Sequence, residues 1–157
     1  MLTLRGVDAD DAWCARLRAK VAADLLDIGL PGLTINVRDA DVRESLMTLT
    51  TMDPPVVALV SMWTQQSYGA QVQAAAALLQ KECDDVAAYL VTESVPLPPP
   101  LTVPGQRTRG LANVALLRRP ADLDESTWLS RWHVDHTPVA IKTSRRSATH
   151  RTQSCAP

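Results

Sequence analysis

Two tryptophans and a histidine recur at every fourth position near the end of the sequence, as Trp128, Trp132 and His136. On a helix this spacing places all three side chains on one face. We expect the indoles to bury against an apolar surface and to carry His136 with them. Burial disfavours the charged imidazole, which leaves a neutral ring that accepts or donates a proton near pH 7. The alternative interpretation is a structural histidine held by hydrogen bonds.

The ends of this helix are also signalled by the sequence. Asp124 suits the N-cap position, and Glu125 suits the positively polarised first turn. Pro138 disfavours helical geometry at Thr137, which predicts that the helix ends or kinks near His136. A position at the helix C-terminus favours the protonated imidazole and so opposes the effect of burial. The sequence leaves open which of these two effects dominates.

The first part of the chain alternates between strand and helix patterns. Apolar residues at helical spacing predict a helix from about Asp10 to Ile28, which Gly29 and Pro31 terminate. A second helix is expected over Tyr68–Ala88. Strands are predicted at residues 2–5, 33–37, 56–63 and 89–95. The order strand, helix, strand, strand, helix, strand indicates the α+β class, with a ferredoxin-like βαββαβ unit over residues 1–95.

A proline-rich segment, residues 96–108, follows this unit and is expected to be a semi-rigid linker. Beyond it the pattern begins again, with a strand at 110–118 and a helix from Asp124 to about His136. Leu2–Arg5 resembles Ala115–Arg118, and Trp13, Arg16 and Leu17 resemble Trp128, Arg131 and Trp132. We interpret residues 109–143 as a partial second copy of the first unit in a tandem repeat.

The tail of the sequence, residues 144–157, shows no apolar period of either kind. It holds too little hydrophobic surface to offset the entropy of ordering the chain, so we expect it to be disordered. The second copy then lacks the further strands and the helix that a complete unit needs. This pattern predicts a truncated second copy, as a frame-shifted or truncated product would have.

The composition is typical of a soluble globular protein. The 157 residues are 46% hydrophobic, and 16 Lys and Arg nearly balance 17 Asp and Glu, so we expect neither a nucleic-acid nor a membrane partner. Three cysteines at irregular spacing predict reduced thiols rather than disulfides or a CxxC pair. Because no apolar leader or membrane-spanning stretch is present in the sequence, we expect a cytoplasmic location.

The sequence contains no nucleotide or flavin motif, so we expect no cofactor. His133 and His136 are three residues apart, but no third ligand stands at a suitable spacing for zinc, and we expect no metal site. A redox or metal protein built on Cys14, Cys83 and these histidines is the weakest of the alternatives.

An arginine-ended strand, a short turn and a helix with paired aromatic residues before a His-x-Pro-Val sequence resemble the EthD-type segment of the dimeric α+β barrel superfamily. The matching residues are Arg118, Arg119, Trp128, Trp132, His136, Pro138 and Val139. The match covers mainly residues 111–143, and the first copy has Val21 where His136 would fall. The resemblance implies a ferredoxin-like unit whose sheet pairs with that of a second unit, forming a barrel with an apolar interior.

The resemblance also implies roles for particular residues. Carried over to this sequence, His136 becomes the catalytic proton donor or acceptor, and Trp128, Trp132, Arg118 and Arg119 become substrate-binding residues. Members of the superfamily include cofactor-independent isomerases, decarboxylases and dehydratases. The leading hypothesis is therefore an EthD-like protein that binds a small apolar organic acid or carbonyl compound between its two copies, as a cofactor-independent lyase or isomerase.

The alternative hypothesis is a non-catalytic binding or assembly module, or an inactive truncated remnant. An incomplete second copy would expose the edge of its sheet and the face of the helix that carries Trp128 and Trp132. Such surfaces tend to associate with another chain. This hypothesis predicts a homodimer formed through an exposed sheet edge.

Overall fold

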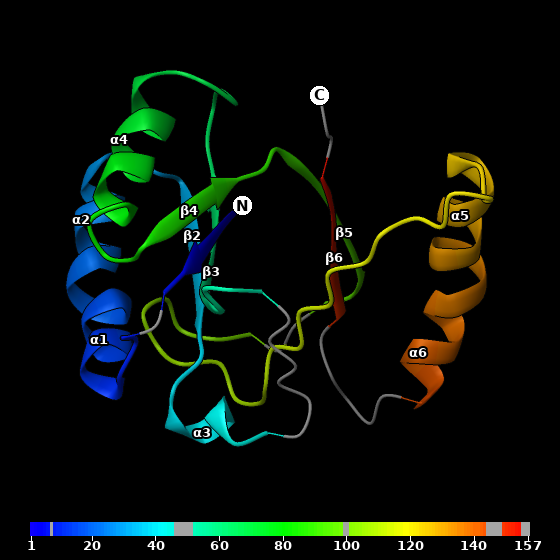
Figure 1. Cartoon of the computed structure of the whole chain (residues 1–157), viewed down its shortest axis with the longest axis horizontal. Coiled ribbons are helices and arrows are strands. Elements are labelled where there is room, and N and C mark those ends of the chain that lie inside the picture. Colours follow the sequence, from blue (N-terminus) through cyan, green and yellow to red (C-terminus); the bar gives the residue numbers. More distant parts are fainter. Residues whose placement is uncertain (7, 46–51, 99–100, 144–148, 155–157) are drawn as a thin grey trace. The chain divides into compact units, whose positions relative to one another are not determined.

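Four short strands rich in leucine and valine build the sheet of the first unit (Figure 1). The computed structural model describes residues 1–6, 8–45, 52–98, 101–143 and 149–154, whose main parts form two compact units, Met1–Val91 and Thr92–Gln153. In the first unit the strands lie in the order β2-β3-β1-β4, and every neighbouring pair is antiparallel. Their bounds are β1 Leu2–Arg5, β2 Gly32–Val37, β3 Val56–Trp63 and β4 Asp85–Ala88. The expected α+β class is confirmed, and the sheet is consistent with a ferredoxin-like fold.

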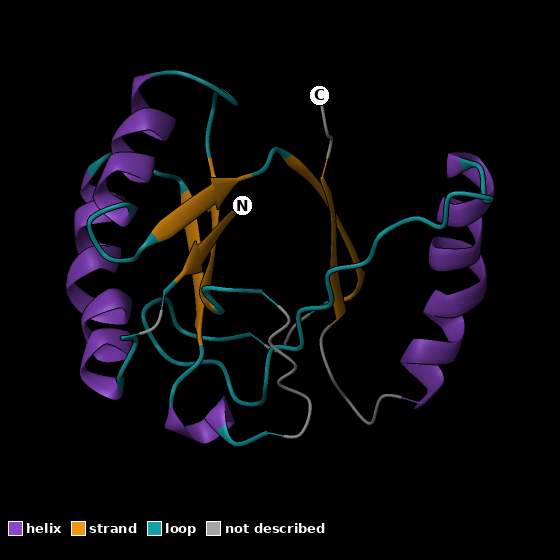
Figure 2. Cartoon of the chain, in the orientation of Figure 1, coloured by secondary structure: helices purple, strands orange, loops and turns teal. Residues whose placement is uncertain are grey.

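Helices cover one face of this sheet (Figure 2). The first helical segment is continuous through α1 Asp11–Arg16, the π-helical η1 Leu17–Val21 and α2 Ala22–Asp27. Asp10 caps its start by accepting a hydrogen bond from the backbone N–H of Trp13, 2.7 Å away. Gly29, at φ 87°, follows its end in the left-handed conformation that glycine adopts without strain. The other helices of this unit are α3 Ala40–Arg43 and α4 Ala70–Leu79.

The hydrophobic core of the first unit lies between the sheet and these helices. Leu2 and Leu4 of β1 are fully buried, and their partners in the register of β3 are Val60 and Ala58, which are buried as well. The helices contribute Trp13, Leu17, Val21, Leu25, Ala75 and Leu79 to the same cluster. Full burial of one leucine contributes about 1.5–3 kcal/mol relative to leaving it exposed. This cluster therefore holds the strands and the helices of the first unit together.

The second helix is shorter than the sequence pattern indicates. The prediction of one helix over Tyr68–Ala88 is wrong, because α4 ends at Leu79 and Asp85–Ala88 form β4. Val86 continues the apolar stripe of the helix in sequence, but in the structure it lies opposite Leu4 in the antiparallel ladder with β1. Pairing with a central strand has overridden the local helical pattern.

The strand predicted at residues 89–95 corresponds to β5 Val91–Leu97, but it is not the fourth strand of the first sheet. It pairs instead with β6 Thr149–Ser154 in a two-stranded sheet. β6 belongs to the tail that the sequence predicts to be disordered. Residues 144–148 and 155–157 of that tail lie outside the described residues.

The second unit contains one long helical segment, through α5 Glu125–Ser130, η2 Arg131–His136 and α6 Thr137–Thr143. The prediction of a strand at residues 110–118 is wrong, because the described residues 101–120 form turns, bends and coil. A strand needs a neighbouring strand to take up its backbone hydrogen bonds. The two strands of this unit, β5 and β6, pair with each other.

The sequence predicts that this helical segment ends or kinks near His136; it does not end there but continues through Pro138, after a π-helical turn at Arg131–His136. Proline inside an α-helix clashes with the carbonyl group four residues earlier. Here the turn before it is π-helical, with backbone hydrogen bonds that span five residues instead of four. The Thr137 hydroxyl donates a hydrogen bond to the carbonyl oxygen of Trp132, 3.1 Å away and five residues back. Pro138 thus lies in the first turn of α6, directly after the π-helical turn.

Candidate functional site

The start of the helix that carries the predicted site residues is fixed by one carboxylate. Asp124 Oδ1 accepts hydrogen bonds of 2.9 Å from the backbone N–H of Thr127 and from the Ser126 hydroxyl. The Thr127 hydroxyl donates to Asp124 Oδ2 over 2.6 Å. These bonds, first those from Thr127 and then that from Ser126, lower the pKa of Asp124 from 3.8 to about 2. The N-cap predicted from the sequence is confirmed.

Two indole rings and one imidazole form an aromatic cluster on this helix, consisting of Trp128, Trp132 and His133. The ring centroids of Trp128 and Trp132 are 5.2 Å apart, with their planes inclined by 41°. The centroids of Trp132 and His133 are 5.3 Å apart, with an inclination of 33°. Both distances lie in the favourable range for aromatic pairs. The two tryptophans therefore contact each other, as their spacing predicts, and all three side chains are half-buried.

His136 lies outside this cluster, and its side chain is exposed. Its expected burial beside the tryptophans is wrong, and the reason is the π-helical turn Arg131–His136. In such a turn the backbone hydrogen bonds span five residues rather than four. Thr137, five residues after Trp132, therefore takes the place next to it and is buried. The acid–base role of His136 stays a prediction.

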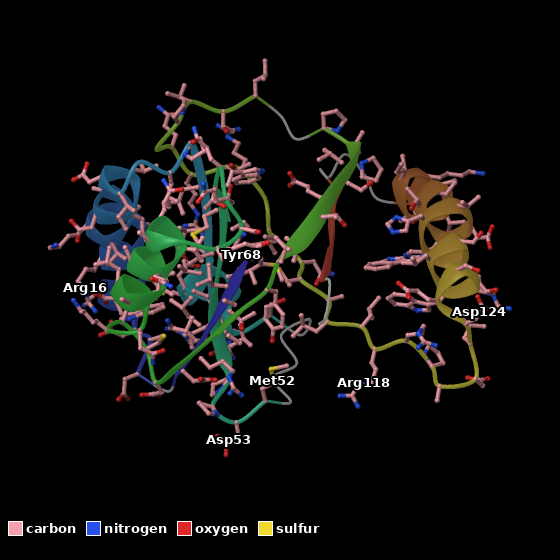
Figure 3. The ribbon with its side chains drawn as sticks, turned by 90° about the horizontal axis from the view of Figure 1, so that it is seen from above. Arg16, Met52, Asp53, Tyr68, Arg118 and Asp124 are labelled. Atoms are coloured by element: carbon pink, nitrogen blue, oxygen red, sulfur yellow. The ribbon has the colours of Figure 1, made fainter. Side chains whose placement is uncertain are left out.

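The two arginines expected to bind substrate are exposed and lie before the helix. The Arg119 guanidinium donates a hydrogen bond to the carbonyl oxygen of Leu123, which closes the turn that leads to Asp124. The Arg118 side chain extends away from the α5 ribbon (Figure 3). The sequence could not indicate that His133, rather than these arginines or His136, adjoins the tryptophans, because no residue pattern marks the π turn.

Two cavities open on the first unit, and the predicted site residues line neither of them. The larger, of about 260 Å³, lies at the start of α4 and is lined by residues including Gln66, Tyr68 and Gln71. The smaller, of about 140 Å³, has walls that include Trp13 and Cys83. Pockets for small organic ligands usually measure about 300–1,000 Å³. Both cavities fall below this range.

The described thiols are not activated for nucleophilic or redox chemistry. Cys14 is fully buried, and burial raises the pKa of its thiol, with a further contribution from the Asp39 carboxylate. Burial also raises the pKa of Cys83, whose Sγ lies 3.4 Å from the carbonyl oxygens of Leu79 and Asp85. A raised pKa lowers the thiolate fraction, which is the reactive form. Cys155 lies outside the described residues.

The part of the chain that the structure describes contains no group of three His, Cys, Asp or Glu side chains able to hold a metal ion. Within the same residues, no helix combines the length and the apolar character needed to cross a membrane. The chain matches no family model, no curated protein and no solved structure. The resemblance to the EthD-type segment therefore stays a prediction.

Proposed function

We propose that this chain is a non-catalytic assembly module, in which the first unit is a folded scaffold and the second unit associates with another protein chain. The observation that carries this proposal is the unequal distribution of buried apolar side chains. Among the described residues, all 13 buried hydrophobic residues lie between Leu2 and Leu79. The first unit thus has a hydrophobic core of its own.

Many of the large apolar side chains described in the second unit are exposed. Nine of them are exposed: Val95, Leu101, Val103, Leu111, Val114, Leu116, Leu117, Val134 and Val139. Six of these nine lie between residues 101 and 117, where the described chain forms neither strand nor helix. Contiguous exposed apolar surface is typical of sites of protein association, whereas single exposed side chains are not, and we infer that these side chains gather in such a surface.

The helix of the second unit lacks a buried apolar face. No residue of α5 or η2 is buried, and Thr137 is the one buried residue of α6. Most helical stability in proteins comes from packing an apolar face, so a helix without such packing is of low stability in water. A partner surface would supply that packing.

The first unit offers another place for association. Among the described strands, β2 and β4 are the outer strands of the sheet, so each pairs along one side. The other side of an outer strand presents backbone donors and acceptors to an incoming chain. A homodimer formed through an edge of this sheet therefore stays a prediction, in addition to association through the second unit.

Hydrogen exchange of the intact chain at low concentration tests the assembly proposal. We expect the amides of β1 and β3 to be strongly protected, whereas those of residues 125–143 exchange close to the rate of an unfolded chain. Equal protection of the helix and the sheet in a dilute monomer would contradict the proposal, because the second unit would then already have buried its apolar surface.

A second candidate function, binding of a small apolar organic acid or carbonyl compound, is favoured by the aromatic cluster. Indole faces and a neighbouring imidazole are suited to an aromatic ring that carries a carboxylate. Benzoate as a probe should then quench tryptophan fluorescence, and Trp128→Phe should weaken this effect whereas Trp63→Phe on β3 should not. Absence of quenching at millimolar benzoate would exclude this class of ligand.

If turnover of such a compound accompanies binding, the proposed acid–base role of His136 is tested by His136→Ala. Loss of a positioned acid or base typically costs about 10²- to 10⁴-fold in rate. His133→Ala is the matched control, because it removes the imidazole that contacts Trp132 and keeps His136. An unchanged rate in His136→Ala would remove this histidine from the mechanism.

A further inference from the structure

The outer edge of β4 presents backbone groups that no described strand uses. On its inner side β4 pairs with β1, and at the end of this ladder Met1 and Tyr89 exchange two backbone hydrogen bonds. Bonded and non-bonded pairs alternate in an antiparallel ladder, so Ala87 turns its N–H and C=O toward β1, whereas Val86 and Ala88 turn theirs away. Ala88 is exposed, and Val86 is half-buried. The outer edge thus has backbone donors and acceptors in register for a further strand.

Residues 111–117, which we call the apolar segment, have the composition of a strand but pair with no described strand. The two described strands of the second unit, β5 and β6, pair with each other, and residues 101–120 form turns, bends and coil. Four large side chains of the apolar segment are exposed: Leu111, Val114, Leu116 and Leu117. Extended segments bind other proteins by adding a strand to the edge of a sheet, where main-chain hydrogen bonds supply affinity.

The charges around the apolar segment and around the start of β4 have opposite signs. Residues 94–121 hold four arginines and no acidic residue. Four carboxylates and two arginines lie at the start of β4, namely Asp8, Glu82, Asp84, Asp85, Arg5 and Arg16. Both arginines form ion pairs there, and four negative charges against two positive leave a net charge of −2. The other outer strand, β2, contains no charged residue and offers no such complementarity.

We propose that the apolar segment of one copy of this chain adds as an antiparallel strand to the outer edge of β4 in a second copy. This inference rests on the proposed function and names its partner. In the register that bonds Val114 to Ala88, Leu116 bonds to Val86 and Arg118 lies opposite Asp84. Antiparallel addition is favoured because Arg118 and Arg119 directly follow the segment, and because antiparallel pairs are slightly more stable than parallel ones.

The proposed pairing also extends the apolar face of the sheet. Residues directly opposite each other in a ladder point to the same face, so Val114 lies beside Ala88 and Leu116 beside Val86. The partners of Ala88 and Val86 in β1 are Leu2 and Leu4, which are buried under the helices. Two apolar side chains that are exposed in the single chain would thus join the helix-covered face.

Proline substitutions test the backbone pairing. Ala88→Pro removes an N–H that points away from β1, a position at which edge strands tolerate proline, so the first unit should fold normally. Val114→Pro removes the matching N–H in the apolar segment, which is coil in the single chain. Ala115→Pro is the matched control, since the N–H of this residue faces away from β4 in the proposed register.

Analytical ultracentrifugation of the full chain measures the effect of these variants. The average mass of the unaltered chain should rise with concentration. Ala88→Pro and Val114→Pro should each weaken self-association by about tenfold or more, because each loses a hydrogen bond and brings a proline ring against the partner strand. Ala115→Pro should associate like the unaltered chain. Circular dichroism checks the fold of Ala88→Pro, and Val114→Pro tests the same contact without altering the first unit.

A mixture of the two blocked variants separates pairing between copies from pairing within one chain. Ala88→Pro keeps an intact apolar segment, and Val114→Pro keeps an intact β4 edge. At about 200 μM each variant alone should stay monomeric, whereas the mixture should form a dimer with one copy of each. A mixture that stays monomeric while the unaltered chain associates would overturn the inference.

Charge reversal tests the direction of the added strand. Arg118→Glu should weaken self-association about threefold, because it places a second negative charge opposite Asp84. Arg109→Glu makes the same change before the apolar segment, at the end away from these carboxylates, and should have a smaller effect. A larger loss in Arg109→Glu than in Arg118→Glu would overturn the antiparallel direction.

The outcomes distinguish this inference from the proposed function. If the chain self-associates but both blocked variants associate normally, the strand addition is wrong and the proposed function stands. If the chain stays monomeric while residues 125–143 exchange rapidly, the partner is another protein and the inference is overturned. If the chain stays monomeric and these residues are protected, both the inference and the proposed function are overturned.

Discussion

Asp124 shows how one residue makes the start of a helix sensitive to pH. Its carboxylate accepts three hydrogen bonds from Ser126 and Thr127, which lower its pKa from 3.8 to about 2. A lowered pKa in the folded state means that the cap stabilises the helix fully above pH 3.8 and loses its effect as the pH falls through about 2. We therefore expect helical ellipticity at 222 nm to decrease over that interval.

Two substitutions at this position separate charge from capping. Asp124→Asn keeps a side chain that caps well but does not titrate, so it should retain the helix at neutral pH and remove this pH dependence. Asp124→Ala should lower helicity at every pH, because Thr127 N–H then lacks its acceptor. Asp122→Ala, at an exposed carboxylate before the cap, serves as the control. Equal pH dependence in the Asn variant and the unaltered chain would show that another group titrates.

The histidines show which part of the candidate site the sequence could not predict. The contact between Trp128 and Trp132 follows from a spacing of four residues, which brings them together in an α-helical turn. The same rule fails at His136, because the turn that leads to it is π-helical. The first helical segment forms a π turn without any proline, so Pro138 by itself does not mark where such a turn forms. No residue pattern in the sequence marks that outcome.

Two adjacent leucines of α2 differ in burial and should therefore differ in their contribution to the free energy of unfolding. Leu25 is fully buried in the core, whereas Leu26 is 49% exposed. Leu25→Ala should therefore lower the free energy of unfolding by about 2–5 kcal/mol, through lost burial and the cavity left behind. Leu26→Ala has the same chemistry in the same helix and should change it by less than about 0.5 kcal/mol. Urea denaturation followed by circular dichroism measures both values, and similar losses would contradict this assignment of the core face.

The sequence predicts an element well where the signals that define it lie within the segment itself. It predicts an element less well where the element forms only by pairing with a strand that is distant in sequence. The first helical segment and β3 agree closely with their predicted ranges, because apolar periodicity and the Gly29 end signal lie within the segments themselves. The sequence pattern predicts the end of a helix where β4 lies, since the pairing of β4 with β1 joins residues about 80 positions apart. Residues 110–118 have the composition of a strand, but the sequence does not show whether a neighbouring strand is present.

The two units of the molecule differ in how many of their apolar side chains are buried. Residues 1–91 enclose the buried hydrophobic residues, whereas the later part of the chain exposes leucines and valines. The charges divide similarly: residues 1–91 carry 7 Lys and Arg against 12 Asp and Glu, and residues 92–157 carry 9 against 5. An acidic unit that holds the buried core is thus followed by a basic segment with exposed leucines and valines. The two units should accordingly open to solvent independently.

Limited digestion with trypsin tests this independence, because the protease cleaves after Lys and Arg in locally unfolded chain. Four exposed arginines lie in the coil before α5, namely Arg107, Arg109, Arg118 and Arg119. Lys20 is exposed as well, but it lies within η1, whose neighbours Leu17 and Val21 are buried in the core. We expect mass spectrometry to show accumulation of an N-terminal fragment that ends at Arg107 or Arg109 while the bond after Lys20 is still intact. Cleavage after Lys20 at a similar rate would mean that the two units open together, because the first unit would then have no greater stability than the coil that follows it.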